Sequence, residues 1–333
     1  MRKSILILAI APLIFMLGAC NSESGKTKPP TNTTSNTEAP VARNILNTIK
    51  KRGKLICGVS GELPGFSFLG TDGKYSGIDV DICRAIAVVL FDNPDAVEFR
   101  NLNAKERFTA LQTGEIDILS RNTTWILSRD ASIGLDFAPV IFYDGQGMMI
   151  RKNSGIKSLE DLKDKGICVQ TGTTTEQNLA DQMRKRNLSY KPVVFEDVNI
   201  TFATYSQGRC DAITADRSAL VSRRTTLPKP EDNVILDELL SSEPLAPAVK
   251  QGDSQWTDLV RWTVYALIKA EELGINSQNL AKFSTNTDPN IKRFLGTEGN
   301  ILEKKGLNFL ANFSEAPEII NNSIKPQKKA KYA

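Results

Sequence analysis

The sequence predicts a two-lobed α/β protein in which each lobe is a mostly parallel sheet flanked by helices. Short apolar runs alternate with amphipathic helical patterns in two separate cycles along the chain, and such alternation is typical of parallel sheets covered by helices. An extended segment follows each cycle. Because two extended crossings between two α/β lobes form a hinge, we expect a ligand cleft between the lobes.

The first cycle begins near Ile45 and ends near Leu119. The expected elements are strands over residues 54–59, 97–99 and 116–119 and helices over residues 79–91 and 104–112. Asp79 stands at the start of the first of these helices, where a carboxylate can accept hydrogen bonds from unpaired backbone N–H groups. We therefore predict that Asp79 is the N-cap of that helix.

The second cycle begins at Ser158, which together with Asp161 resembles a capping box that opens a short helix. The elements expected after it are strands over residues 166–169, 192–195 and 211–214 and helices over residues 174–185, 198–206 and 219–223. Asp216 occupies the N-cap position of the last helix.

Two extended segments, residues 140–150 and 239–249, are predicted to be the hinge strands. They divide the chain so that residues 44–145 and 245–325 form lobe 1 and residues 146–244 form lobe 2. Residues 253–272 show the pattern of a long amphipathic helix, which we expect to pack on lobe 1. The tryptophans of this helix, Trp256 and Trp262, are interpreted as core anchors rather than ligand platforms.

Residues 1–19 have the pattern of a lipoprotein signal peptide. Arg2 and Lys3 precede an apolar run that is too short to span a bilayer comfortably. The run ends in Leu-Gly-Ala-Cys20, which resembles a bacterial lipobox, and this resemblance implies cleavage before Cys20 and lipidation of that residue. Residues 20–43 would then be the lipidated cysteine and a polar tether that cannot bury a core.

Four further cysteines are Cys57, Cys83, Cys168 and Cys210. An exported, oxidising setting favours disulfides, and four cysteines allow three connectivities. If the lobes fold separately, Cys57–Cys83 and Cys168–Cys210 are the natural pairs. Reduced, buried cysteines are the alternative.

The composition excludes several classes of function. The chain has no histidine, which excludes histidine-dependent nucleophiles and histidine-ligated metals. There is no CxxC pair and no aspartate-rich loop, so we expect no metal and no cofactor. The formal net charge is +4 and falls to +2 without Arg2 and Lys3, and nucleic acid is therefore not an expected partner. An enzyme that uses paired carboxylates is disfavoured but not excluded.

Three segments could meet in the cleft. The loop over residues 119–130 follows a first-lobe strand and carries Arg121 and Arg129. At Gly172 and Thr174 a strand turns into a helix N-terminus, which suits a small anion or polar ligand. Asp216 ends a second-lobe strand, and strand carboxyl ends are where open α/β sheets bind ligands.

A free amino acid matches these groups. Its carboxylate needs an arginine and N–H donors, and its ammonium needs a carboxylate. Both charges must be paired once the cleft excludes water, because an unpaired buried charge costs several kcal/mol. Arg129 or Arg121 with Thr174, opposite Asp216, would supply that complement. A simple helix cap remains the alternative for Asp216, and a solvated surface charge for either arginine.

Several long motifs resemble one family. They are residues 57–60, 63–67, 77–84, 107–112, 119–125, 143–147, 168–176, 208–212 and 270–275. Over roughly residues 45–300 they closely resemble the general L-amino-acid-binding proteins of polar amino-acid ABC importers, within the type II periplasmic solute-binding proteins.

The resemblance implies a role for each matching residue. Arg129 would bind the α-carboxylate, with Asn122 and Thr124 beside it. Thr174 and the backbone of Gly172 would complete the contacts to the carboxylate. Asp216 would bind the ammonium, and Phe66 would form an aromatic wall over the ligand side chain. The loop reads Asn-Thr-Thr-Trp-Ile-Leu-Ser-Arg where many relatives have a shorter Thr-x-x-Arg step. The choice between Arg121 and Arg129 therefore stays open.

The resemblance also implies the partners and the location. We expect a non-enzymatic, monomeric binding protein that delivers L-amino acids to an ABC permease. Its location would be the periplasm or the outer face of the cell membrane, attached only through Cys20. An enzyme on the same fold, similar to cyclohexadienyl or arogenate dehydratases and using the same cleft, is the alternative.

Overall fold

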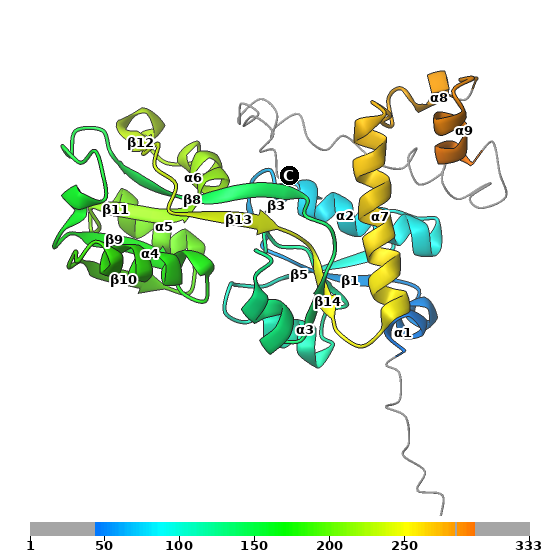
Figure 1. Ribbon diagram of the computed structural model, residues 1–333, viewed down its shortest axis with the longest axis horizontal. Helices are drawn as coiled ribbons and strands as arrows, with labels where there is room; N and C mark the ends of the chain where they lie inside the picture. Colours follow the sequence, from blue (N-terminus) through cyan, green and yellow to red (C-terminus); the bar gives the residue numbers. More distant parts are fainter. Residues whose placement is uncertain (1–43, 284, 297–333) are drawn as a thin grey trace, which may run out of the picture. The chain divides into compact units, whose positions relative to one another are not determined.

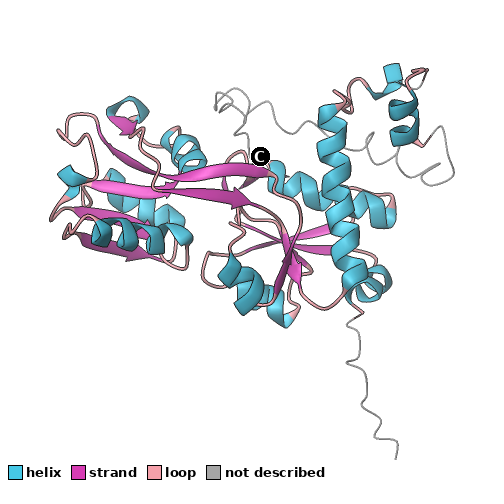
Figure 2. Ribbon diagram, viewed as in Figure 1, coloured by secondary structure: helices cyan, strands magenta, loops and turns pink. Residues whose placement is uncertain are grey.

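The computed structural model describes residues 44–283 and 285–296. Within them the chain forms two lobes, each built on its own β-sheet with helices packed against it (Figure 1 and Figure 2). The predicted signal peptide, Cys20 with its tether and the part of lobe 1 after residue 296 lie outside the described residues. No helix in the described ranges is both long enough and apolar enough to cross a membrane.

The sheet of the first lobe has the strand order β5-β1-β6-β14-β7. Its strands are β1 (Leu55–Val59), β5 (Val97–Asn101), β6 (Ile118–Leu119), β7 (Leu135–Phe137) and β14 (Ala248–Lys250). β1 pairs in parallel with β5 and β6, whereas β14 is antiparallel to β6 and β7. A small antiparallel sheet of β2 (Glu62–Leu63), β3 (Ser67–Leu69) and β4 (Tyr75–Ser76) follows β1.

The sheet of the second lobe has the order β10-β9-β11-β8-β12, and β13 also pairs with β8. Its strands are β8 (Phe142–Arg151), β9 (Gly166–Gln170), β10 (Lys191–Phe195), β11 (Ala212–Asp216), β12 (Asn233–Ile235) and β13 (Ser241–Leu245). β9 is parallel to β10 and β11, and the remaining pairs are antiparallel. Both sheets are therefore mixed. Each has a parallel core, and β14 in the first lobe and β8 in the second run antiparallel to the strands of that core.

The two crossings are the predicted extended segments. β8 enters the second lobe, and β13 runs antiparallel beside it on the way back to β14 (Figure 1). The loop after β6 is held against this pair, since Thr124 forms an isolated bridge with Leu245 and Trp125 N donates to Pro244 O at 2.8 Å. The crossings thus carry residues from both lobes into one region.

Helices cover both sheets. The first lobe has α1 (Ile45–Arg52), α2 (Ile78–Phe91), α3 (Arg107–Thr113), α7 (Ser254–Glu272), α8 (Leu280–Phe283) and α9 (Pro289–Leu295). The second has α4 (Thr174–Lys185), α5 (Val198–Ser206) and α6 (Arg217–Arg224), and short helical turns lie at Ser128–Ser132, Glu160–Leu162 and Pro230–Asp232. As predicted, α7 packs on the first lobe, where it contacts α1, α2 and β7.

Each lobe has its own apolar core and its own disulfide. Trp256 is fully buried against the core of the first lobe, and its indole N–H donates to Asp117 O at 3.1 Å. Cys57–Cys83 joins β1 to α2, and Cys168–Cys210 joins β9 to the turn before β11. The pairing predicted for separately folding lobes is confirmed.

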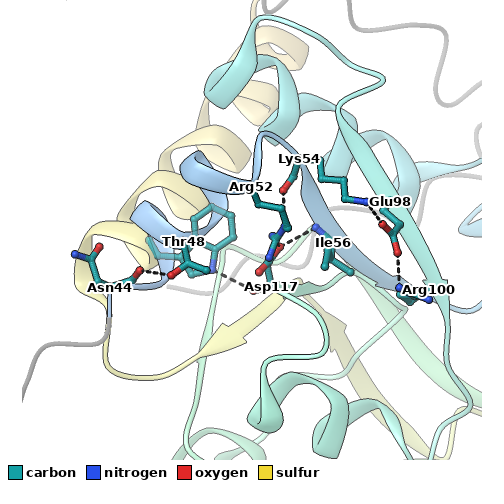
Figure 3. Close-up of polar contacts among 9 residues, drawn as sticks. Asn44, Thr48, Arg52, Lys54, Ile56, Glu98, Arg100 and Asp117 are labelled. Atoms are coloured by element: carbon teal, nitrogen blue, oxygen red, sulfur yellow. Dashed lines mark hydrogen bonds and ion pairs between the residues drawn. The ribbon is translucent and has the colours of Figure 1, made fainter.

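A polar network fixes the start of β1 (Figure 3). The carboxylate of Asp117 accepts a hydrogen bond from Ile56 N at 2.7 Å and also pairs with Arg52 at the end of α1. On the neighbouring strand, Glu98 pairs with Lys54 and with Arg100. These contacts tie α1 and β5 to the strand on which the first lobe is built.

Two sequence predictions are wrong, for Asp79 and for Trp262, and the N-cap position predicted for Asp216 is confirmed without a capping hydrogen bond. Gly77, not Asp79, is the N-cap residue of α2, and the Asp79 side chain is buried instead. Asp216 is the N-cap residue of α6 by backbone position, but its carboxylate makes no capping hydrogen bond. Trp262 is 68% exposed and contacts Tyr265 with tilted rings, so of the two tryptophans only Trp256 is a core anchor.

Candidate functional site

A small cavity of about 60 Å³ lies between the two lobes. Its walls come from the loops after β1 and β6, from α3, and from α4, α5 and α6 with the end of β11. The lining residues are Ser60, Glu62, Leu63, Arg107, Arg121, Asn122, Thr124, Gln170, Thr173, Thr174, Thr175, Val198, Thr201, Phe202, Thr214, Ala215, Asp216, Ala219 and Arg223.

Asp216 supplies a buried carboxylate to this cavity. It is the last residue of β11, so the strand itself delivers the side chain to the cleft. Its Oδ2 accepts a hydrogen bond from Asn122 Nδ2 of the opposite lobe at 3.3 Å. Burial raises the pKa of Asp216 to about 8, with further increases from Asp144 and Glu243. An arriving cation would relieve this unfavourable charge.

The two neighbouring carboxylates stand opposite each other on the crossing strands, in the β8–β13 pair. Asp144 accepts hydrogen bonds from the backbone N–H and hydroxyl of Ser218, and burial raises the pKa of Asp144. Glu243 is 2% exposed and accepts hydrogen bonds from Thr124 Oγ1 at 2.6 Å and Thr174 Oγ1 at 2.8 Å. Asp144 and Glu243 therefore lie close enough to Asp216 to raise its pKa.

Buried guanidinium groups provide the opposite charge. Arg107 is 3% exposed and Arg121 is 5% exposed, and both line the cavity. Burial lowers the pKa of each, and for Arg107 the nearby Arg129 and Arg121 lower it further. No ion pair within 4.0 Å joins either one to a carboxylate in the described ranges. Such donors favour an anionic ligand group.

These two arginines have hydrogen-bonding capacity left over. Arg107 Nε has no hydrogen-bond partner among the described residues, and its Nη1 makes only long contacts of 3.4–3.5 Å to Thr123 Oγ1 and Arg121 O. Arg121 donates from Nε to Leu102 O at 2.8 Å, and no described residue accepts from its terminal nitrogens. Because buried donors are normally satisfied, a ligand is the natural acceptor.

Arg129 lies behind this pair and is not among the lining residues. Its Nη1 donates to Thr124 O at 2.9 Å, and its guanidinium lies over the Phe108 ring, 5.1 Å from the centroid. Burial lowers the pKa of Arg129 to about 10. Arg121 therefore lines the cavity, whereas Arg129 holds the backbone of the loop that carries Thr124.

The strand-to-helix junction forms the second-lobe wall. Thr173 is the N-cap residue of α4 and accepts from Glu176 N at 3.1 Å, while Thr174 begins the helix and lines the cavity. The N–H of Gly172, expected to face a ligand, instead donates to Glu176 Oε2 at 3.0 Å. The backbone N–H groups of Thr174 and Thr175 lie in the first turn of α4, where no carbonyl of the same helix can accept from them. They are therefore the hydrogen-bond donors that the start of α4 offers.

Gly172 serves the site in a different way. It has φ +74°, and a Cβ added there would lie 3.1 Å from Lys105 Cα of the first lobe. Glycine therefore allows both the left-handed turn and the close approach of the two lobes.

The first-lobe loop is held by a buried acid. Asp79 accepts from Asn122 N at 3.0 Å, and Asn122 has φ +29°. Burial raises the pKa of Asp79 to about 6. This contact explains why Asp79 is not a helix cap, since its carboxylate turns toward the loop and positions Asn122 across from Asp216.

Phe66 is not on the cavity wall. It is buried, packs edge to face on Phe142 and belongs to a cluster with Leu63 and Ala219, both of which line the cavity. It therefore lies behind the apolar wall instead of forming it.

Sequence reasoning missed Arg107, Arg223, Glu62 and Glu243. A signal existed for the two arginines, because each falls on the buried side of a helix, Arg107 with Ala110 and Leu111 and Arg223 with Ala219 and Leu220. For Glu243 the signal was weaker: a single acid next to a proline in a segment expected to cross between lobes.

The chain is similar to known proteins along most of its length. Residues 55–279 match the family model of bacterial extracellular solute-binding proteins, family 3. The chain is 52% identical over 253 residues to the general L-amino acid-binding periplasmic protein AapJ of Rhizobium johnstonii, covering 76% of this chain and 74% of that protein. It is 46% identical over 265 residues to the glutamate/glutamine/aspartate/asparagine-binding protein BztA of Rhodobacter capsulatus, covering 79% and 78%.

A solved structure agrees with these relatives. An ABC transporter periplasmic binding protein from Brucella ovis, with glutathione bound, is 48% identical with a TM-score of 0.76, and the match covers 80% of this chain and 85% of that one. The family match, these similarities and the two-lobed fold lead to one conclusion. The chain belongs to family 3 of the bacterial extracellular solute-binding proteins.

Proposed function

We propose that this protein captures free L-amino acids in the cavity between its lobes and delivers them to the permease of an ABC importer. The observation that carries the proposal is the meeting of a buried carboxylate, Asp216, and buried guanidinium groups, Arg107 and Arg121 among them, on the wall of one small cavity. A zwitterion is the ligand that pairs both charges without leaving either one unpaired. The relatives are described as binding proteins and not as enzymes, which favours this function over a dehydratase.

The roles of the acidic end follow from its contacts. Asp216 holds the ligand ammonium, and Asn122 orients Asp216 from the other lobe. Thr124 and Thr174 complete this region, their hydroxyl oxygens lying 3.4 Å apart across the interface. Hydrogen bonds to an ammonium are strong because the donor is charged.

At the opposite end, the ligand carboxylate faces Arg121, with Arg107 beside it and the free N–H groups at the start of α4 across the cavity. Arg129 and Gly172 support this end, the first by holding the Thr124 loop and the second by allowing the lobes to meet. Phe66 holds the apolar wall for the ligand side chain through Leu63 and Ala219.

Isothermal titration of the purified protein with the twenty standard L-amino acids tests the function. We expect at least one to bind with a Kd in the micromolar range or below. A panel in which no amino acid binds more tightly than millimolar would rule the proposal out.

The choice between Arg121 and Arg129 can be made with one comparison. The best amino acid and its α-carboxamide, which lacks the negative charge, are titrated into Arg121→Met and Arg129→Met variants. The variant that removes the carboxylate partner loses the preference for the acid, whereas the variant that removes a supporting residue weakens both ligands alike.

We also propose that the protein acts as a monomer at the outer face of the membrane, attached through lipidated Cys20. The Leu-Gly-Ala-Cys20 pattern and the polar residues after it support this location. Cells fed a radiolabelled fatty acid should label the wild-type protein but not a Cys20→Ala variant. Equal labelling of both would contradict the anchor.

A further inference from the structure

Glu243 is a buried acid that the proposed binding roles do not use. It lies on β13, the strand that returns from the second lobe to the first, and it does not line the cavity. Its Oε2 accepts the hydroxyls of Thr124 and Thr174, which come from opposite lobes. Its Oε1 accepts hydrogen bonds from Asn178 Nδ2 at 2.8 Å and from the hydroxyl of Ser241.

These four partners define where the protons lie. An amide N–H₂ can only donate, and a carboxylate can only accept. With four donors around it, the side chain of Glu243 fits as an acceptor at every position. Each threonine has a single hydroxyl proton, and in this arrangement both protons point at Glu243.

The orientation of these protons sets what the threonines offer to the cavity. Thr124 and Thr174 both line it, and with their protons committed to Glu243 they present only lone pairs to a ligand. Lone pairs favour a donor such as an ammonium and disfavour a carboxylate. The sequence-based expectation that Thr174 contacts the carboxylate can then hold for its backbone N–H but not for its hydroxyl.

We propose that Glu243 is a positioning residue that makes Thr124 and Thr174 acceptors for the ligand ammonium and thereby fixes which way round the ligand binds. This inference rests on the amino-acid-binding function proposed above. Asp216 provides the charge for the ammonium, and the two hydroxyls complete its hydrogen bonds, one from each lobe. The carboxylate is left to the arginine end of the cavity.

A Glu243→Gln variant tests the inference because glutamine keeps the shape of the side chain but turns one oxygen into a donor. The probes are L-glutamate and (S)-2-hydroxyglutarate, which has an uncharged hydroxyl in place of the ammonium. We expect the variant to bind L-glutamate about 10- to 150-fold more weakly, the range for hydrogen bonds to charged groups. The affinity for 2-hydroxyglutarate should change less than about 3-fold, because its hydroxyl can both donate and accept. If another amino acid binds best in the panel, that amino acid and its 2-hydroxy acid replace the pair.

Two further variants separate positioning from folding. Glu238→Gln removes an acid that pairs with Arg186 on the surface at 2.6 Å and should leave both affinities unchanged. In a double-mutant cycle, Thr174→Val and Glu243→Gln should be non-additive for L-glutamate, since both act through the same hydroxyl. If Glu243→Gln fails to fold, a Thr124→Val/Thr174→Val variant carries the same comparison of the two probes.

The outcomes are distinct. Equal losses for both probes, or fully additive effects in the cycle, would overturn the role of Glu243. A wild-type protein that binds no amino acid at all would instead overturn the proposed function.

Discussion

At the residue scale, Asp216 shows how a fold can bury a carboxyl group whose ionised form it does not stabilise. β11 brings the carboxylate into the cleft, Asn122 gives it one hydrogen bond, and Asp144 and Glu243 repel it. A group in this state is poorly placed for stability and well placed to bind a cation. Its role is therefore best tested by ligand binding and by pH separately.

Replacing Asp216 should weaken amino-acid binding severely. Asp216→Ala leaves the ligand ammonium buried without its partner, which costs about 2–5 kcal/mol, or roughly 30-fold to several thousandfold in Kd. Titration calorimetry with the best amino acid measures the loss. The corresponding 2-hydroxy acid is the control, since it has no ammonium to lose. An Asp216→Ala protein that binds the amino acid within about 3-fold of wild type would contradict the assignment.

The stability of the ligand-free protein should fall as the pH rises. The pKa of Asp216 is raised to about 8 in the folded protein, above about 3.9 for an unfolded aspartate. The folded state therefore holds this proton more tightly, and the stability it gives is full below about pH 4 and is lost as the pH rises through about 8. Asp79 and Asp81, whose pKa values burial raises to about 6, act in the same direction.

An Asp216→Asn variant isolates the contribution of this one residue. Thermal unfolding of both ligand-free proteins should be measured between pH 5 and pH 9. The melting temperature of the variant should rise relative to that of the wild type as the pH increases. A difference in melting temperature that stays constant across this range would show that Asp216 does not titrate as proposed.

At the element scale, apolar periodicity predicted most of the helices and strands. The predicted and observed bounds of α4 and α5 coincide, and each helix has a residue directly before it whose side chain caps it, Thr173 and Asp197. The cap was mistaken at Asp79, where the sequence shows an acid at a helix start but not the tertiary partner that turns it away, whereas Asp216 does hold the predicted N-cap position. The local sequence pattern therefore predicts where a helix or strand lies but not which residues its side chains contact in the folded protein.

The same limit applies to the candidate site. Strand ends and a helix start placed Asp216, Thr174 and Arg121 in the cleft, the family resemblance added Asn122 and Thr124, and all five line the cavity. Arg107 and Glu243 were not, since the burial pattern of α3 shows that Arg107 is buried but does not show which face of the other lobe it meets, and the signal for Glu243 was weaker still.

Each disulfide should stabilise its own lobe by a similar amount. Cys57–Cys83 spans 26 residues and Cys168–Cys210 spans 42. In the chain-entropy model these loops correspond to about 3–4 kcal/mol each. Chemical denaturation of the Cys57→Ala/Cys83→Ala variant should show this loss of unfolding free energy in the transition that the fluorescence of the buried Trp256 reports. For the Cys168→Ala/Cys210→Ala variant, the same loss should appear in the transition of the second lobe, followed by circular dichroism.

The control for the disulfides is the wild type under reducing conditions. Reduction should lower stability as the paired substitutions do and should have no further effect on a protein lacking all four cysteines. A reduced wild type that unfolds at the same denaturant concentration as the oxidised protein would contradict the prediction.

At the scale of the whole described region, the lobes are joined by polar contacts at the rim of the cavity as well as by the crossings. Arg223 Nη1 donates to Glu62 O at 3.0 Å, and Asn199 Nδ2 donates to Glu62 Oε1 at 2.8 Å. Ser222 Oγ donates to Pro64 O at 2.8 Å. Such contacts form only when the lobes meet, so they stabilise the closed form that retains a ligand.

Ser222 offers the cleanest test of closure because it joins the lobes without lining the cavity. Ser222→Ala removes one hydrogen bond of the closed form, worth about 0.5–1.5 kcal/mol, or a 2- to 12-fold change in equilibrium. The ligand meets the open form, so the association rate should hold while the dissociation rate rises by that factor, as measured by stopped-flow with a donor and acceptor dye on the two lobes. Arg224→Ala on the same helix, whose side chain makes no hydrogen bond to the described residues, should change neither rate. If Ser222→Ala slowed association instead, the contact would belong to the open form, and the closed arrangement of these lobes could not be what retains the ligand.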